Sequence, residues 1–181
     1  MDSPLTNDGI QRCRKWARHL ASPTWSWNRI ISSPLPRARE TAKCINENLD
    51  IPIAIDDGLR EQDWGLWEGL TIEEVHKNFP NQLEQQVSLG WSFCPPQGES
   101  RLEVSERVTG TLAAHVKKHP GEQLLIITHQ GVIKSLIYRI ENRQFLPEEK
   151  ELINSNQLHT ITGNSGVFLG ATYNIALPEQ L

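Results

Sequence analysis

The sequence has no run of basic residues and no long apolar run. Its 181 residues include 18 Lys and Arg against 22 Asp and Glu, which gives a formal net charge of −4 at pH 7. A protein whose main partner is a nucleic-acid backbone needs a basic surface, so we expect no nucleic-acid partner. No stretch approaches the roughly 20 apolar residues that a membrane-spanning helix requires, so we expect no membrane partner. The polar, acidic start MDSPLTNDG does not resemble a signal peptide, and we expect a cytoplasmic protein.

Cysteine is scarce as well. Cys13, Cys44 and Cys94 are odd in number and widely spaced, and no CxxC or mixed Cys/His ligand pattern accompanies them. We interpret them as reduced thiols that pack in the protein. The sequence therefore predicts neither a disulfide framework nor a zinc site, and nothing in it calls for a metal or another cofactor.

What is present is an alternation of helical and strand patterns. With 38% apolar residues, a chain of this length suits one compact domain spanning residues 1–181. Because strands separated by helices form mainly parallel sheets, we expect a three-layer α/β/α fold. The expected helices cover residues 5–22, 35–49, 100–119 and 132–140, and the expected strands cover residues 28–32, 51–55, 123–128 and a terminal hairpin over 157–174.

Two helix starts carry capping signals. Thr6 or Asn7 is the expected N-cap of the first helix, and Ser100 is the expected N-cap of the helix that begins near Arg101. Between the second strand and that helix, residues 59–99 contain short helical patterns among Gly and Pro. We interpret residues 59–99 as an insertion that covers a site, in the manner of a lid.

Candidate site residues follow the expected strands. In parallel sheets ligands bind beyond the carboxyl ends of the strands, which draws attention to Ser33, Arg37, Glu61 and His129. A histidine there meets anions beside free backbone N–H groups, an arginine clamps phosphate or carboxylate, and a partly dry carboxyl with a raised pKa donates a proton. Three of them also have an ordinary explanation. His129 could cap the strand locally, Arg37 could form a surface ion pair with Glu40, and Glu61 could be solvated.

Four motifs in order resemble the histidine phosphatase superfamily, the group of phosphoglycerate mutases, α-ribazole phosphatases and related phosphomonoesterases. They are SSPLPRARETA, LREQDWGLWEG, PPQGES and IITHQGVI, and the resemblance covers nearly the whole chain. It implies a phosphoglycerate mutase-like fold and a phosphomonoester substrate. It also implies a mechanism in which one histidine attacks phosphorus, and water then hydrolyses the phosphohistidine. This scheme needs no metal and no cofactor.

The resemblance also implies roles for single residues. Arg37 matches the arginine that clamps phosphate, Glu61 the proton donor to the leaving group, and His129 the second histidine, which stabilises the charge of the transferred phosphoryl group. Such roles suit a reaction in which most of the catalysis comes from positioning and fixed positive charge. Ser33 and Gln130 are further expected phosphate-binding residues, Gln130 through its backbone N–H. PPQGES is expected to position the 59–99 segment.

One part of the family pattern does not occur. Family members open with a strand that ends in Arg-His-Gly and carries the nucleophilic histidine, whereas MDSPLTNDG resembles the segment just after that motif. Without that strand we expect a gap in the sheet and negligible activity of this polypeptide. We also expect one of three outcomes for the fold: instability, aggregation, or repair by exchange of elements in a homo-oligomer. Three explanations stay open: a reading frame whose start is assigned too late, a deliberately shortened polypeptide, and a degenerate relative that binds phosphorylated ligands without turnover.

The five other histidines lack a motif that would make them the nucleophile. His19 follows Arg18 but lies within a helical pattern, and His115 and His119 are expected at a solvated helix end. His76 and His159 have no motif around them.

In overall size and in its short insertion, the chain resembles α-ribazole phosphatases and broad phosphatases of the superfamily more than the longer phosphoglycerate mutases. The resemblance therefore implies hydrolysis, with mutase-type phosphoryl transfer as the alternative. Trp64, Trp67 and Trp91 suggest an aromatic lid for a bulky phosphomonoester, or else simple packing of the insertion.

Overall fold

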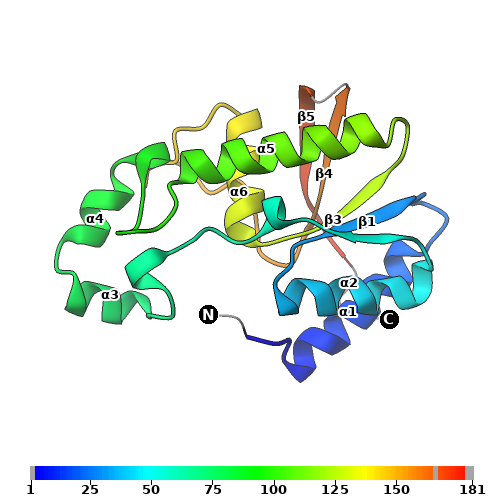
Figure 1. Cartoon of the computed structure of the whole chain (residues 1–181), viewed down its shortest axis with the longest axis horizontal. Coiled ribbons are helices and arrows are strands. Elements are labelled where there is room, and N and C mark those ends of the chain that lie inside the picture. The colour runs from blue at the N-terminus through cyan, green and yellow to red at the C-terminus, as the bar shows by residue number, and fades with distance from the viewer. Residues whose placement is uncertain (1–2, 165–166, 178–181) are drawn as a thin grey trace.

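The structure, a computed structural model, describes residues 3–164 and 167–177. In chain order its elements are α1 (Asn7–Leu20), β1 (Arg29–Ser32), α2 (Pro36–Leu49), β2 (Ile53–Ile55), η1 (Asp57–Leu59), η2 (Gly65–Trp67), α3 (Ile72–Asn78), α4 (Gln82–Val87), η3 (Gly90–Ser92), α5 (Arg101–Lys118), β3 (Leu124–Ile127), α6 (Gln130–Ile140), β4 (Leu158–Asn164) and β5 (Val167–Ile175). Figure 1 shows the parallel strands between two layers of helices, with α3 and α4 set apart on one side.

Among the described residues, the main sheet is parallel throughout, and its outer strands β2 and β3 each pair on one side only. Its order is β2-β1-β3, and β4 and β5 form a separate antiparallel hairpin. The predicted layers, the parallel sheet and its interruption next to the hairpin are confirmed. The hairpin itself is also where the sequence predicts it.

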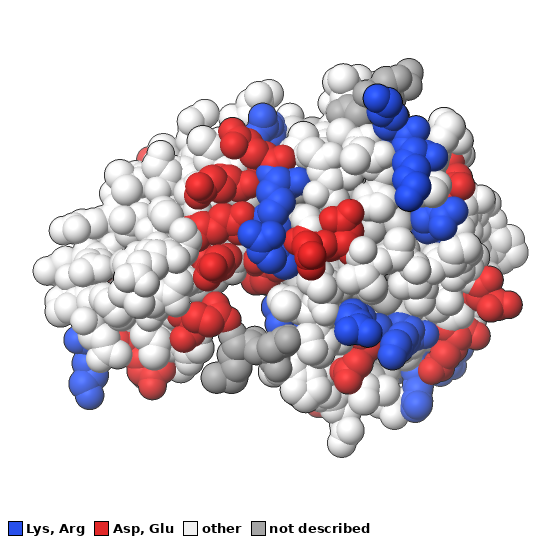
Figure 2. All heavy atoms as spheres, viewed as in Figure 1, with Lys and Arg blue, Asp and Glu red and all other residues white. Residues whose placement is uncertain are grey.

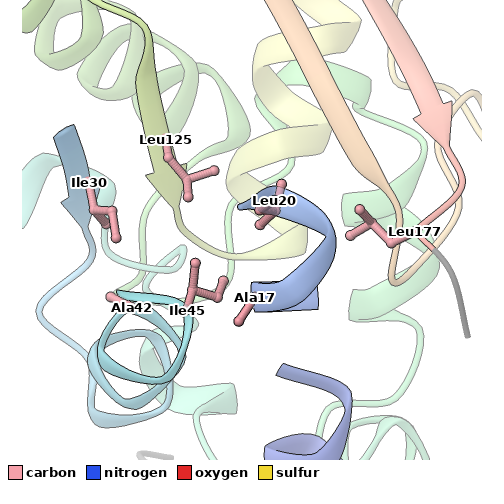
Figure 3. Packing of buried hydrophobic residues seen from close by; sticks show 7 residues of the cluster. All are labelled: Ala17, Leu20, Ile30, Ala42, Ile45, Leu125 and Leu177. Atoms are coloured by element: carbon pink, nitrogen blue, oxygen red, sulfur yellow. The ribbon is translucent and has the colours of Figure 1, made fainter. Parts of the chain in front are cut away.

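Each face of the sheet is covered by a helix pair because each strand is apolar on both sides. On one face α1 and α2 pack against β1 and β3 through Ala17, Leu20, Ile30, Ala42, Ile45 and Leu125. Leu177, which follows β5, joins this cluster (Figure 3). On the other face, α5 and α6 pack around Ile31 through Val104, Val108, Leu112, Val132 and Leu136.

The helix starts agree with the capping signals. The Thr6 hydroxyl accepts from the N–H of Gly9, so Thr6 rather than Asn7 caps α1. Ser100 caps α5 in a reciprocal box with Glu103, since each side chain accepts from the other residue's backbone N–H. These caps set where α1 and α5 enter the layers.

The 59–99 segment has a small core of its own. Trp67, Val75, Leu83 and Phe93 are buried there, and Trp64, Leu70, Phe79 and Val87 pack around them. The segment therefore stands beside the sheet as a unit with its own packed core.

Charge, cysteine and helix length complete the description of the fold. Charged side chains of both signs are interspersed on the face shown in Figure 2. Cys13, Cys44 and Cys94 are free thiols, as predicted. Among the described residues, no helix combines the length and the apolar character needed to cross a membrane.

Candidate active site

The carboxyl ends of β1 and β3 bring Ser33 and His129 together. The strands are paired neighbours, and the N–H of Ser33 donates to the carbonyl of Ile127 at 2.9 Å. This pairing places the Ser33 hydroxyl 2.7 Å from Nε2 of His129. Both side chains are buried, with exposed fractions of 0% and 6%, so the hydrogen bond fixes the imidazole ring in the floor of the site.

His129 is held in its neutral form. Burial lowers its pKa to about 4, and the positive charges of Arg37 and Arg107 act in the same direction. A neutral imidazole can donate one hydrogen bond and accept another. An anion arriving beside it would favour the protonated ring.

Arg37 lies in the first turn of α2, directly after the loop that follows β1. Pro36 is the first residue of this helix, a position that suits its fixed φ. Arg37 lines the same cavity as Glu61 and His129, and its charge influences the pKa of both. The three side chains that the motifs single out are thus brought together.

The carboxyl of Glu61 lies against the first turn of α6. Burial raises its pKa, while hydrogen bonds from the N–H groups of Gln62 and Gly131 and the charges of Arg37 and Arg107 partly oppose the rise. A Cβ atom at Gly131 would lie 2.7 Å from Oε1 of Glu61, so this close approach needs glycine. The raised pKa agrees with the expected proton donor, and the start of α6 contributes to the environment of the carboxyl through the N–H of Gly131.

Gln130 is the first residue of α6. Its helical φ is negative, as its expected backbone role requires. The side chain is exposed and accepts a hydrogen bond from the Ser155 hydroxyl at 3.2 Å. Its backbone N–H lies at the helix start, where N–H groups have no partner within the helix.

The site opens into a cavity of about 540 Å³. Arg37, Glu61 and His129 line it together with residues 153–159, which lead into β4. A second cavity of about 1000 Å³ lies on the α5 and α6 side, and both cavities share residues of β3 and the start of β4. The space therefore passes between β3 and β4 from one helical layer to the other, which is the gap that the sequence analysis expects.

The tryptophans do not form the aromatic site wall that was one of the two expectations. Trp67 is 1% exposed in the core of the 59–99 segment. The indole N–H of Trp91 donates to the carbonyl of Arg143 at 2.7 Å, and its ring packs edge-on against Phe145. Trp64 is half-buried against Trp67. Packing is the better explanation, because the insertion needs these large apolar side chains to build its own core.

Two other histidines differ from expectation. The side chain of His115 is 13% exposed and pairs with Asp56 at 2.8 Å, so it is not part of a solvated helix end. His159, for which no role was predicted, lines the same cavity as His129. Within the described residues, no group of three His, Cys, Asp or Glu side chains is arranged to hold a metal ion.

Sequence reasoning missed Arg107 of α5. Its guanidinium binds Glu99 and two backbone carbonyls next to Glu61. No local pattern signals Arg107, because its backbone partners Gly58 and Arg60 are distant in the sequence.

Comparison with known proteins gives the family. A model of the histidine phosphatase superfamily, branch 1, matches residues 1–165. The uncharacterized phosphatase PhoE of Bacillus subtilis is 30% identical over 154 residues, which are 85% of this chain and 73% of PhoE. Several mycobacterial relatives are longer, and the chain spans 29% of their length.

Solved structures share the fold. YhfR of Bacillus stearothermophilus superposes with a TM-score of 0.86 at 28% identity, covering 97% of this chain and 86% of YhfR. The α-ribazole phosphatase of Shigella flexneri has the same fold, with a TM-score of 0.77 at 22% identity over 98% of this chain and 86% of its own. The chain belongs to the histidine phosphatase superfamily and is by family an enzyme of the phosphatase type.

Proposed function

We propose that this site binds the phosphoryl group of a small phosphomonoester and supports its hydrolysis through a phosphohistidine. The observation that carries the proposal is the convergence of Arg37, Glu61 and His129 on one cavity at the carboxyl ends of β1 and β3. Arg37 clamps the phosphoryl oxygens, with the backbone N–H of Gln130 and the Ser33 hydroxyl as further donors in the site. His129 stabilises their charge, and Glu61 protonates the leaving oxygen.

Glu61 suits this role because its raised pKa keeps a larger fraction of the carboxyl protonated. His129 suits its role because a neutral ring can take up a proton when the dianion arrives. Binding of inorganic phosphate, measured by calorimetry, tests the core of the proposal. Arg37→Met and His129→Gln should each weaken it at least about tenfold, the loss of roughly one charged hydrogen bond.

The nucleophile is the part that the 181 residues do not supply in a recognisable motif. We therefore propose that this polypeptide alone hydrolyses p-nitrophenyl phosphate at no more than background rates. Turnover that disappears in His129→Ala would instead mean that a residue of this chain attacks phosphorus, with His159 on the cavity wall as the first to test.

A ligand-binding protein without turnover is the competing function. It would bind phosphate through the same residues, so binding does not separate the two. Added strand peptides that carry Arg-His-Gly do separate them, because only an intact catalytic site would gain turnover. Mutase-type transfer, the other alternative, would move the phosphoryl group of the phosphomonoester substrate to a hydroxyl of added 3-phosphoglycerate and release the substrate alcohol. Hydrolysis would instead release the phosphoryl group as inorganic phosphate.

Self-association through the open edge belongs to the same proposal. β3 has an unpaired side, and apolar residues line the space between it and β4. Exposed strand edges recruit other strands. We expect concentration-dependent dimers by light scattering, and a monomer across the micromolar range would remove element exchange from the proposal.

A further inference from the structure

The guanidinium of Arg107 donates to four oxygens, two on the carboxylate of Glu99 and two on backbone carbonyls just before Glu61. Nε and Nη2 meet the two carboxylate oxygens of Glu99 at 2.8 and 2.7 Å, which is the bidentate fork geometry. Nη1 donates to the carbonyls of Gly58 at 2.8 Å and of Arg60 at 3.1 Å. One side chain thus holds the backbone just before Glu61 and the carboxylate at the end of the 59–99 segment.

Glu99 extends this grip to the other side of Glu61. Its carbonyl accepts from Nε2 of Gln62 at 2.7 Å, and its N–H donates to the carbonyl of Asp63 at 2.9 Å. The side chains of Arg107 and Glu99 are 15% and 12% exposed, so solvent screens the pair only weakly. Residues on both sides of Glu61 are therefore attached to a single ion pair.

Two further contacts hold the backbone before Glu61, one at Leu59 and one at Gly58. The carbonyl of Leu59 accepts from the Thr128 hydroxyl at 2.7 Å, which ties this segment to the end of β3. Gly58 packs so closely on α5 that a Cβ atom there would lie 1.8 Å from Oγ1 of Thr111. The three carbonyls from residue 58 to residue 60 all have donors, and Arg107 supplies two of them.

We propose that Arg107 is a positioning residue whose contacts with Gly58, Arg60 and Glu99 place the Glu61 carboxyl in the cavity opposite His129. Arg107 itself does not line that cavity, so it acts through Glu61 and has no direct contact with substrate. The inference rests on the proposed function, since it assigns Glu61 the part of the proton donor.

Two effects of Arg107 on Glu61 have opposite signs. As a nearby positive charge, Arg107 lowers the pKa of Glu61, so removing the charge alone would raise that pKa. As a positioning residue, it keeps the carboxyl buried, and burial is the largest cause of the raised pKa. If the segment loosens, the carboxyl reaches water and its pKa falls toward the ordinary value of about 4.3.

The experiment is a ¹³C NMR titration of the Glu61 carboxyl in the full chain and in Arg107→Met and Arg107→Lys. Lysine keeps the charge but cannot form the fork, so it separates charge from geometry and serves if the methionine variant does not fold. Arg29→Met is the matched control, because Arg29 pairs with Glu122 at 3.2 Å and lies at the opposite end of β1. Inorganic phosphate binding by wild type is measured alongside.

Positioning predicts that the pKa of Glu61 falls in Arg107→Lys, where the charge is kept and only the fork is lost, and stays unchanged in Arg29→Met. In Arg107→Met the pKa should lie above that of Arg107→Lys, because the positive charge is lost as well. An unchanged or raised pKa in Arg107→Lys would overturn the inference, since the residue would then act through charge or not at all. Absence of phosphate binding by wild type would instead count against the proposed function. The Glu61 titration would still report whether Arg107 positions the carboxyl.

Discussion

At the scale of single residues, His129 and Glu61 lie in one cavity yet respond to burial in opposite ways. Burial disfavours the charged form of each, so the pKa of His129 falls to about 4 while that of Glu61 rises. At neutral pH the site therefore holds a neutral imidazole and a carboxyl that releases its proton less readily than usual. Both groups are prepared for an anionic ligand that brings negative charge to one and needs a proton from the other.

Binding of a dianion should be coupled to proton uptake by His129. Sulfate stays a dianion between pH 7 and pH 5, so any pH dependence of its affinity comes from groups of the protein. Its affinity should rise as pH falls from 7 toward 5, because the bound anion raises the pKa of His129 from about 4. Calorimetry in buffers of different ionisation enthalpy measures the protons taken up.

His159 provides the comparison for that experiment, because it lines the same cavity and burial lowers its pKa as well. His129→Gln should remove the proton uptake, and His159→Gln should retain it. If only His159→Gln removes the uptake, the assignment of the phosphate-binding histidine is wrong.

Glu61→Gln should stabilise the fold at pH 7. The folded state raises the pKa of Glu61 above its unfolded value, so the stability associated with this group is present at low pH and is lost as pH rises through the folded pKa. Glutamine removes that loss, and we expect a gain of about 0.5–2 kcal/mol, the usual range for such substitutions. Urea unfolding at pH 7 and pH 4 measures it, and the gain should shrink at pH 4. An equal gain at both values would contradict an effect of ionisation.

At the scale of elements, Arg101 joins the 59–99 segment to the chain that follows α6. Its guanidinium donates to the carbonyls of Gly90 and Phe145 at 3.1 and 3.2 Å. It also lies 4.2 Å from the ring centre of Phe93 and 4.5 Å from that of Phe145. Burial lowers its pKa to about 10, which leaves the side chain charged at neutral pH. Arg101, at the start of α5, thus binds both the 59–99 segment and the chain that follows α6.

Arg101→Met should lower the free energy of unfolding by about 2–4 kcal/mol, since two carbonyls lose a charged donor and two rings lose a cation. Arg139→Met is the control, because Arg139 is exposed and makes one 3.3 Å bond to Ser105. Its cost should stay within about 0.5 kcal/mol. Urea unfolding of both variants measures the two losses in free energy of unfolding. Similar losses would show that the contacts of Arg101 contribute little to stability.

The sequence is most informative where a signal is local. Thr6 and Ser100 predict where their helices begin, because a capping hydroxyl and its N–H partner lie within three residues of each other. The motifs likewise locate Arg37, Glu61 and His129, since each lies within six residues of the end of a strand. Arg107 escaped because its partners Gly58 and Arg60 lie 49 and 47 residues away in the chain. Contacts of that kind depend on how α5 packs, which no local pattern contains.

At the scale of the whole molecule, a space separates β3 from β4 and extends into cavities on both helical layers. Within the described part of the chain, β3 pairs on one side only, with β1. A strand inserted there would pair with the four residues of β3, Leu124–Ile127, and cover the apolar side chains on either face. A strand parallel to β3 would also end at the same edge of the sheet as His129.

A peptide of about six β-branched residues followed by Arg-His-Gly should therefore bind this chain and produce p-nitrophenyl phosphate turnover. Binding follows from main-chain pairing with β3 and burial of apolar side chains, and turnover follows from placing an imidazole beside Arg37 and His129. The same peptide ending in Arg-Ala-Gly should raise the melting temperature equally and produce no turnover. If the two peptides bind equally well and neither yields turnover, the site binds phosphate without catalysis. If neither peptide binds, the space between β3 and β4 does not accept a strand, and the prediction of strand insertion is wrong.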